Sequence, residues 1–302
     1  MARYTAARVG GPAEALLEIY SIDELVRACQ LIWQDDLPFS IFGGGSNILV
    51  SDSGVPRVVL INRARRIRFE ESHEPPSVWA ESGANFGMVA RQAAAKGFSG
   101  LEWAVGIPGT IGGAVVGNAG AHDGDMAGSL LVAEILHRDL DREQWSVEQL
   151  GYQYRSSVLK RSGLHGRDEG RLLGSSPSAI VLAASLHLTR SEPGEVQAKI
   201  DEYVAQRHRT QPPGASMGSM FVNPPGDYAG RLIEAAGLKG TRIGDAQIST
   251  LHGNFFVNLG EASASDVYEL IQLARQTVAE KFSVDLELEV ELVGEWKFNR
   301  EV

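Results

Sequence analysis

The sequence contains two glycine-rich loops, and they restrict the possible folds more than any other feature. The second spans 106–120; the first directly follows the apolar run 39–42 and consists of Gly43, Gly44, Gly45, Ser46 and Asn47. Glycine lacks a Cβ and tolerates φ > 0, so such loops let backbone N–H groups approach a phosphate closely. A single loop is equally typical of a tight turn. Two loops in separate segments favour a diphosphate held from both sides, and therefore a dinucleotide.

Composition and charge exclude several classes of protein. The chain has 302 residues, enough for two or three compact units, and a net charge of −10 without a basic run, which argues against a nucleic-acid partner. No apolar stretch reaches the roughly 18 residues of a membrane span. Cys29, the only cysteine, excludes an intramolecular disulfide and a cysteine metal site, fits a reducing cytoplasm, and is expected in the core. No His or carboxylate cluster has metal-ligand spacing, so no metal is expected.

Strand and helix patterns divide the chain into three units. The first, 1–62, combines predicted strands with a helix that Ser21 and Glu24 open as a capping box. The second, 63–194, contains further strands, a helix and the long glycine loop. The third, 195–302, begins with a predicted helix, contains a second helix over 265–282 that Ser263 and Asp266 cap in S-x-x-D spacing, and closes on a strand. Because strands, helices and turns mix throughout, the fold class is α+β.

The last predicted strand, 285–293, alternates apolar residues with glutamates. Glu287, Glu289 and Glu291 therefore share one face of that strand by its period of two. A solvated sheet edge is the simplest interpretation of three such carboxylates.

Other candidate residues do not define a chemistry by themselves. The second glycine loop resembles part of a Rossmann fingerprint, but its spacing differs from G-x-G-x-x-G, and the acid at the right distance, Glu134, falls in a predicted strand. Ser219 is not in a G-x-S-x-G nucleophile elbow, so a turn serine is the simpler interpretation. Arg155 is typical of a surface arginine and His252 of a loop histidine.

A series of short segments carries more information than any one of them. Besides the two glycine loops they are Thr5-x-x-Arg8-Val9-Gly10-Gly11-Pro12-Ala13, Tyr154-Arg155-x-Ser157, Gly218-Ser219-x-Phe221-x-Asn223-Pro224, 229–240, Gly244-x-Ala246-Gln247-Ile248-Ser249-x-x-His252, Asn254-Phe255, Asn258 and Glu289-Val290-x-x-x-Gly294. In this order they resemble one family closely, the UDP-N-acetylenolpyruvoylglucosamine reductases. The resemblance covers nearly the whole chain.

The resemblance implies a fold, a reaction and a cofactor. The fold would be the FAD-binding type of vanillyl-alcohol oxidase and p-cresol methylhydroxylase, two α+β subdomains, followed by an α+β substrate domain. The reaction would be NADPH-dependent reduction of the enolpyruvyl ether of UDP-N-acetylglucosamine to UDP-N-acetylmuramate, a step of peptidoglycan precursor synthesis. FAD would be bound non-covalently by Gly43, Gly44, Gly45, Ser46, Asn47, Gly106, Pro108, Gly109, Thr110, Gly112, Gly113, Asn118, Ala119 and Gly120.

The resemblance also implies catalytic roles. Arg155 would stabilise the charge that develops on the carboxylate side of the substrate double bond, a contribution typically worth about 3–4 kcal/mol. Ser219 would protonate the α-carbon. Glu289 is chosen over the flanking glutamates because it stands five residues before Gly294, and a neighbouring substrate carboxylate would raise its pKa. The expected substrate-binding residues are Tyr154, Asn223 and His252.

The sequence departs from the family pattern at Thr210, where many members have a lysine before Gln-Pro. A phosphate-binding lysine is missing there, and Arg207 or Arg209 is the expected substitute. The chain resembles the branch of the family without an inserted substrate-covering tyrosine. The polar region 162–177 is expected to be a surface excursion, and the protein a cytoplasmic monomer.

Two other functions remain open at this stage. An oxygen-using oxidase could share the flavin fold, but it would be expected to tether FAD through a His or Cys, and neither glycine loop contains one. A non-catalytic protein that binds FAD or a sugar nucleotide would not need Arg155, Ser219 and Glu289 at the family positions. A spectral titration with NADPH distinguishes these functions.

Overall fold

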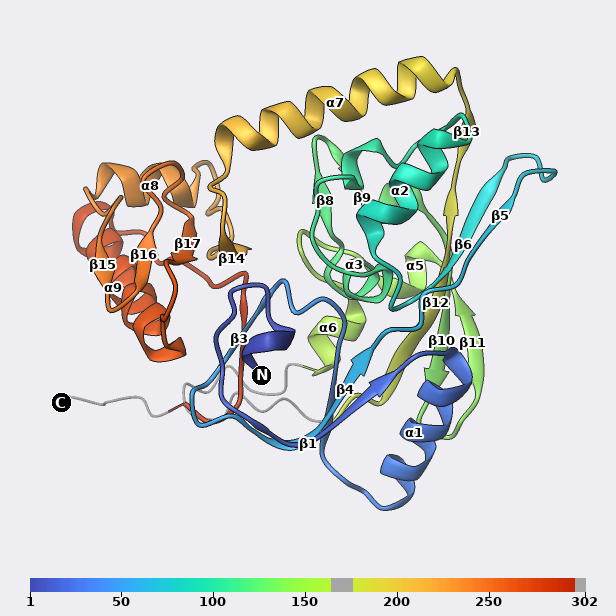
Figure 1. The fold of residues 1–302 in the computed structure, drawn as a ribbon, viewed down its shortest axis with the longest axis horizontal. Helices are drawn as coiled ribbons and strands as arrows, with labels where there is room; N and C mark the ends of the chain where they lie inside the picture. Colours follow the sequence, from blue (N-terminus) through green and yellow to red (C-terminus); the bar gives the residue numbers. More distant parts are fainter. Residues whose placement is uncertain (164–175, 297–302) are drawn as a thin grey trace.

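The computed structural model describes residues 1–163 and 176–296, which form three units, and the long helix α7 (Pro193–Thr210) connects the second unit to the third. Figure 1 shows α7 running along the top of the molecule, from β13 (Thr189–Arg190) to β14 (Ala215–Ser219). The predicted surface excursion at 162–177 lies largely outside the described residues.

A parallel three-stranded sheet forms the first unit. Its order is β1 (Ala13–Ile19), β4 (Val55–Asn62), β2 (Phe39–Phe42). The predicted cap is confirmed, since Ser21 Oγ accepts from the Glu24 N–H at the start of α1 (Ile22–Gln34). The Glu24 carboxylate reaches back one residue further than predicted, to the Tyr20 N–H at 2.7 Å. Cys29 lies on the buried face of α1, as expected, and burial raises the pKa of its thiol to about 12.

An antiparallel five-stranded sheet forms the second unit, in the order β11-β10-β12-β6-β5. The strands are β5 (Ile67–Glu70), β6 (Ser77–Glu81), β10 (Leu130–His137), β11 (Arg142–Trp145) and β12 (Ala179–His187), with the short strands β7 (Phe98–Ser99), β8 (Gly120–Ala121) and β9 (Gly124–Asp125). The helices are α2 (Phe86–Ala95), α3 (Ile111–Gly117), α4 (Met126–Ser129), α5 (Val147–Leu150) and α6 (Val158–Gly163), with a 3-10 turn at Glu102–Ala104; a second 3-10 turn, Ala2–Tyr4, lies at the N-terminus of the first unit. The long glycine loop thus surrounds α3.

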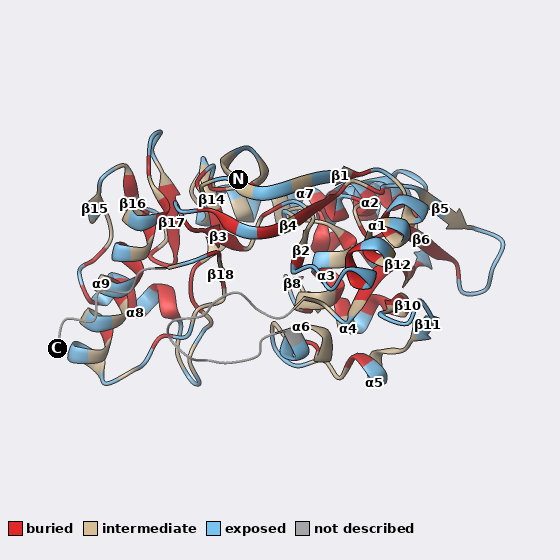
Figure 2. Cartoon of the chain, turned by 90° about the horizontal axis from the view of Figure 1, so that it is seen from below, coloured by how far each residue is buried: buried red, intermediate tan, exposed pale blue. Residues whose placement is uncertain are grey.

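The third unit combines a four-stranded antiparallel sheet with two helices. The sheet order is β14, β17 (Phe255–Asn258), β16 (Ala246–Ile248), β15 (Arg242–Ile243). The helices are α8 (Ala229–Ala235) and α9 (Ala264–Phe282). Figure 2 shows buried residues in β16 and β17 on one side of the molecule and around β12 and α2 on the other. Each side therefore has its own apolar core, and α7 contributes Val196 and Ile200 to the core of the second unit.

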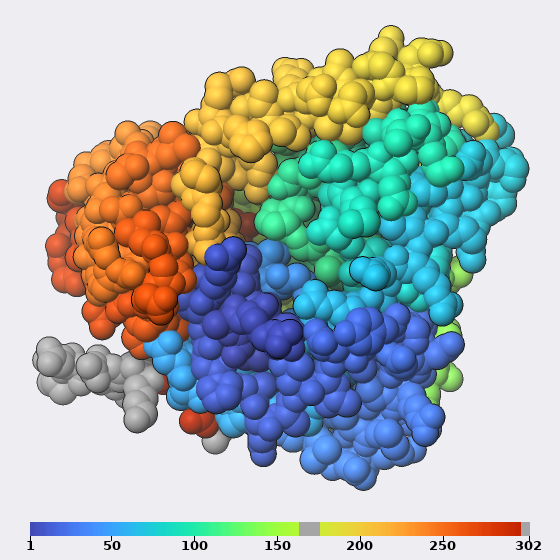
Figure 3. Space-filling model, viewed as in Figure 1, coloured from blue at the N-terminus to red at the C-terminus, as the bar shows by residue number. Residues whose placement is uncertain are grey.

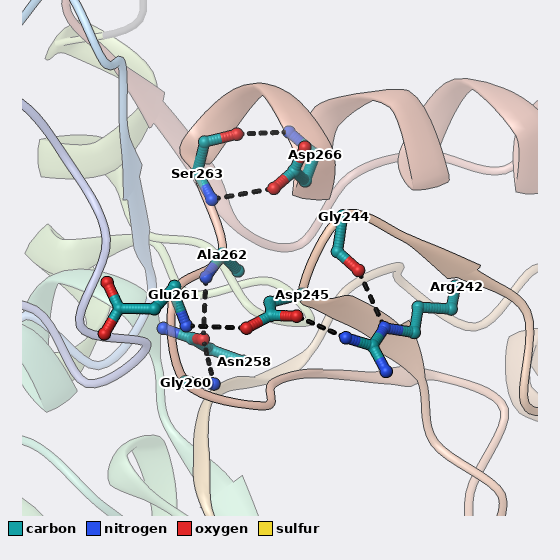
Figure 4. Close-up of polar contacts among 9 residues, drawn as sticks. All are labelled: Arg242, Gly244, Asp245, Asn258, Gly260, Glu261, Ala262, Ser263 and Asp266. Carbon is teal, nitrogen blue, oxygen red and sulfur yellow. Dashed lines mark hydrogen bonds and ion pairs between the residues drawn. The ribbon is translucent and has the colours of Figure 1, made fainter.

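Polar side chains fix the loop that leads from β17 into α9 (Figure 4). The predicted S-x-x-D cap is confirmed as a reciprocal pair: Ser263 Oγ accepts from the Asp266 N–H at 3.0 Å, and Asp266 accepts from the Ser263 N–H at 2.9 Å. Asn258 Oδ1 accepts from Gly260 and Ala262, and its amide donates to Ala7 O at 2.9 Å. Asn258 therefore ties the third unit to the N-terminal segment.

The end of the described chain returns to the first unit. β18 (Glu291–Val293) pairs in parallel with β3 (Ile48–Val50). The predicted strand 285–293 is therefore wrong over most of its length, because Leu288 forms only an isolated bridge to Phe221 and the chain bends at 289–290 before it reaches β3. Asp52 strengthens this junction by accepting from the N–H groups of Ala264 and Ser265 at the start of α9, both at 2.8 Å.

No helix among residues 1–163 and 176–296 has the length and apolar character needed to cross a membrane.

Candidate active site

A cavity of about 560 Å³ lies where the three units meet. In Figure 3 the first, second and third units, coloured in sequence order from blue to orange, converge at the centre of the molecule below α7. Residues of both glycine loops line the cavity together with Arg155, Ser219 and Glu289. The structure therefore brings the predicted cofactor loops and the three predicted catalytic residues to one site.

The two glycine loops are in direct contact within this cavity. Ser46 Oγ donates to the carbonyl oxygen of Pro108 at 3.1 Å. A Cβ added to Gly44 would lie 3.3 Å from the Cα of Gly109, and one added to Gly43 would lie 2.2 Å from Thr110 Oγ1. Such approaches require glycine in the first loop, and Gly109 itself has φ +127°.

Several backbone N–H groups of these loops are available to an anion. Those of Gly44, Gly45, Ser46, Gly109 and Thr110 donate no hydrogen bond within the described part of the chain. After Thr110, N–H groups of the second loop already have partners: that of Gly112 donates to Ser82 O and that of Gly113 to Thr110 Oγ1. Free N–H groups in a glycine-lined cavity fit the diphosphate of a dinucleotide such as FAD.

Two predicted cofactor residues do not line the cavity. Asn118 is buried, where its amide donates to Gln153 O and its Oδ1 accepts from the Ala127 N–H, both at 3.1 Å. Gly106 packs against Arg207 of helix α7. A Cβ added to Gly106 would lie only 2.7 Å from Arg207 Cδ, so there is no room for a side chain there. The remaining predicted residues, from Gly43 to Asn47 and from Pro108 to Gly120, do line it.

Arg155 is held at the cavity by a tight turn. Gln153 and Ser156 exchange backbone hydrogen bonds, which places Tyr154 and Arg155 at the tip. Arg155 has φ +54°, an uncommon left-handed conformation for a residue with a side chain. Arg155 Nη1 lies close to Gly120, because a Cβ added to that glycine would be only 3.2 Å from it. The Arg155 side chain is 27% exposed. The turn thus aims a cation along the second glycine loop rather than into solvent.

Ser219 ends β14 directly after a strand irregularity. The pairing of β14 with β17 shifts between Ser216 and Ser219, and Gly218 has φ +78°. Ser219 lines the cavity, and its side chain forms no hydrogen bond with the described residues. The segment behind it is fixed by Asn254, which is 3% exposed and bonds both backbone groups of Phe221.

Glu289 lies directly beside Arg155 in the lining of the cavity. Its Oε1 lies 3.1 Å from Arg155 Nε, although the Nε–H is not well directed at the carboxylate. Burial raises the pKa of Glu289, and the nearby cations Arg155 and Lys160 only partly oppose this effect. The raised pKa was predicted from a substrate carboxylate, but in the protein alone burial is already sufficient.

The three glutamates do not share one environment. Glu287 is exposed, whereas Glu291 lines the cavity and forms an ion pair with Lys160 at 3.2 Å. The prediction of one common face fails because the chain bends at 289–290. Lys160 in α6, with a side chain that is 14% exposed, was not identified from the sequence. Its position six residues after Tyr154 gave no signal that the fold would bring it to Glu291.

The two arginines expected to replace the missing lysine are placed differently. Arg207 lines the cavity, forms no ion pair within the described residues, and has a pKa lowered by burial. Arg209 is exposed and does not line it.

The three predicted substrate-binding residues lie outside the cavity wall. Tyr154 is 60% exposed and stacks beside the Arg155 guanidinium. Asn223 Oδ1 accepts from the Ala229 N–H at the start of α8. His252 Nδ1 accepts from the Asn254 N–H at 3.1 Å, and burial lowers the pKa of the ring. Their substrate-binding roles stay predictions.

Comparison with known proteins agrees with this geometry. A family model described as an FAD binding domain matches residues 13–135, which contain both glycine loops. The fold and the cavity together define an FAD-dependent flavoprotein of the α+β class.

A second family model, the C-terminal domain of UDP-N-acetylenolpyruvoylglucosamine reductase, matches residues 209–293. The chain is 46% identical to the reductase of this name from Chloroflexus aggregans, over 97% of this chain and 95% of that protein. It is 43% identical to the one from Rubrobacter xylanophilus, over 97% and 93%. The crystal structure of the Thermus caldophilus reductase superimposes with a TM-score of 0.78 at 37% identity, over 97% of this chain and 96% of that one. The chain belongs to the UDP-N-acetylenolpyruvoylglucosamine reductase family.

Proposed function

We infer that this chain uses NADPH and FAD to reduce the enolpyruvyl ether of UDP-N-acetylglucosamine to UDP-N-acetylmuramate. Membership of the family supports the substrate and the reaction. One structural observation carries the inference: a single cavity contains both cofactor loops and a cation, a hydroxyl and a carboxylate at the family's catalytic positions. The product is a precursor of peptidoglycan.

The residues present fit the cofactor. The unpartnered N–H groups of Gly44, Gly45 and Ser46 from one loop and of Gly109 and Thr110 from the other would bind the FAD diphosphate non-covalently. When bound, FAD supplies hydride transfer, from NADPH to the substrate double bond.

Each catalytic residue would act on a different part of the enolpyruvyl group. Arg155 would bind the substrate carboxylate and stabilise the negative charge that develops there. Ser219 would give its hydroxyl proton to the α-carbon, because Ser219 lines the cavity and its side chain has no hydrogen-bond partner among the described residues. Glu289, with a pKa raised by burial, would be protonated more readily than an exposed glutamate and would donate to the enolate side.

The division of labour among the units is also a proposal. Units 1–62 and 63–194 would bind FAD. Unit 195–302 would bind the sugar nucleotide through residues that include Asn223 and His252, and Tyr154 of unit 63–194 would assist it. We further propose that the protein works as a monomer in the cytoplasm. A single cysteine, fully buried, is compatible with that compartment.

A spectral titration tests the function. The purified protein should be yellow, NADPH should bleach it anaerobically, and the enolpyruvyl sugar nucleotide should restore the colour without oxygen. Colour restored only by oxygen would indicate an oxidase. A protein that NADPH does not bleach would be a binding protein, and either result would overturn the inference.

A further inference from the structure

Asn47 connects the first glycine loop to the segment that carries Glu289. Its Nδ2 donates to the carbonyl oxygen of Glu289 at 3.0 Å. The main-chain carbonyl oxygen of Asn47 accepts from the Glu291 N–H, also at 3.0 Å. Asn47 was predicted as a cofactor residue, but these two contacts also join it to the backbone of Glu289 and Glu291.

The segment around Glu289 depends on such contacts because it belongs to no strand. The bend at 289–290 falls between the isolated bridge at Leu288 and the start of β18 at Glu291. The Glu289 N–H donates to Met220 O at 3.0 Å. Within the described residues, Asn47 is the hydrogen-bond partner of the Glu289 carbonyl. The Glu289 N–H is thus held by Met220, the residue directly after β14, and the Glu289 carbonyl by the first glycine loop.

The chemistry of the contact fixes the orientation of the Asn47 side chain. A carbonyl oxygen can only accept, so the amide must present its NH₂ group to Glu289. An alanine at this position would leave the carbonyl without a protein donor, and an aspartate would place a second acceptor against it. Both changes would free the bend while leaving Glu289 itself intact.

We propose that Asn47 is a positioning residue that sets the Glu289 carboxylate beside Arg155, so that the loop that cradles the cofactor also aligns the catalytic acid. The proposal rests on the role given to Glu289 under the proposed function. It predicts that Asn47 matters for the step that uses Glu289 and not for the delivery of hydride by NADPH.

Rapid kinetics on FAD-saturated protein test this proposal. In Asn47→Ala, anaerobic reduction by NADPH should proceed at close to the wild-type rate, whereas reoxidation by the enolpyruvyl sugar nucleotide should slow about 3- to 10-fold, the scale of one lost hydrogen bond. Ser53→Ala is the matched control: it lies outside the cavity lining and removes another side-chain hydrogen bond from the first unit to the C-terminal segment, the 2.8 Å bond to Glu295 O, without touching Glu289. Equal slowing of both half-reactions, or selective slowing in the control as well, would overturn the proposal.

A double-mutant cycle separates this proposal from the assignment of Glu289. If Asn47 acts through Glu289, Asn47→Ala should slow reoxidation no further in a Glu289→Gln background, whereas additive losses would show that Asn47 acts independently. If Glu289→Gln alone leaves reoxidation unchanged, the assignment of Glu289 fails instead.

Hydrogen exchange supplies a readout that does not depend on activity. In FAD-loaded Asn47→Ala, a peptide covering 286–293 should exchange faster than in the wild type, because the Glu289 carbonyl loses its anchor. A peptide covering 246–258, in β16 and β17, should be unchanged. Wild-type protection of 286–293 in the variant would contradict the proposal whatever the kinetics show.

Discussion

Arg155 Nε and Glu289 Oε1 lie 3.1 Å apart, although one residue belongs to a turn of the second unit and the other to a bend of the third. Both side chains are mostly buried, and both line the cavity. Burial raises the pKa of Glu289 by more than the neighbouring cations lower it. The pair is therefore a cation and a readily protonated acid on one wall, which suits a substrate that develops negative charge between them.

Glu289→Gln should slow reoxidation of the reduced enzyme by the enolpyruvyl sugar nucleotide by about 10³-fold or more, the scale of a lost catalytic acid or oxyanion donor. The glutamine has nearly the same volume, so packing is retained. Glu287→Gln is the exposed control and should change the rate little. Stopped-flow absorbance measures both. A crippling effect of Glu287→Gln, with Glu289→Gln active, would reverse the assignment.

Glu291→Gln should have an intermediate effect, although the sequence pattern favours Glu289 over this residue. It would leave Lys160 without its ion-pair partner beside the cavity. Because Glu291 is 42% exposed, the pair itself contributes little stability. The expected change is a higher KM for the anionic substrate or for NADPH, measured in steady state. Kinetics identical to the wild type would remove Glu291 from the site.

Ser219→Ala should separate the two half-reactions. Reduction by NADPH delivers no proton to carbon, so its rate should stay close to that of the wild type. Reoxidation by the substrate should fall about 10²- to 10⁴-fold, the range for a positioned general acid. Ser216→Ala, on the same strand, is the control. Equal losses in both half-reactions of Ser219→Ala would indicate a structural role.

Gly109→Val should yield colourless protein. An added Cβ would lie 2.9 Å from Ser46 Oγ, and the valine methyls would enter the space assigned to the diphosphate. Because φ +127° also strains any side chain there, Gly43→Ala provides a second test at a glycine with ordinary φ, where the Cβ meets Thr110. Gly194→Ala, with nothing within 4 Å, is the control. Flavin absorbance measures FAD content. A yellow, folded Gly109→Val would show that the diphosphate lies elsewhere, and colour retained in acid-precipitated wild type would contradict non-covalent binding.

The pKa of Glu289 should make stability depend on pH in a defined direction. Because the folded protein raises this pKa above its ordinary value of 4.5, the folded state holds the proton more tightly than the unfolded state. That contribution is present below pH 4.5 and is lost as the pH rises through the folded pKa. Urea unfolding across this range should therefore show Glu289→Gln gaining stability relative to the wild type as the pH rises. A difference that stays constant with pH would contradict the burial of this carboxylate.

The sequence predicted local features well and the meeting of distant ones poorly. The caps at Ser21 and Ser263 depend on residues three positions apart, so they were visible in the sequence. The prediction that the two glycine loops bind one ligand came from their composition, but their direct contact through Ser46 and Pro108 could not be predicted. The last strand was extended too far because the alternation of leucine and glutamate continues across a bend that only the pairing with β3 imposes.

The catalytic residues show the same limit. Arg155, Ser219 and Glu289 were identified by resemblance, and their convergence needed the fold. Lys160 and the second role of Asn47 were missed, because an ion pair or an amide contact across so many residues leaves no periodic trace. The choice between Arg207 and Arg209 also required the structure, since helix α7 directs one to the cavity and the other to solvent.

The parallel pairing of β3 with β18 has a consequence for the order in which the enzyme is completed during synthesis. A nascent chain that has emerged through β14 already contains both glycine loops and Arg155, but it lacks Glu289 and leaves β3 without its neighbour. Contacts between segments so far apart form late, because loop closure must precede them. The ribosome therefore releases both glycine loops well before Glu289, and a chain that stops short of residue 289 would keep the proposed cofactor loops without the proposed catalytic acid.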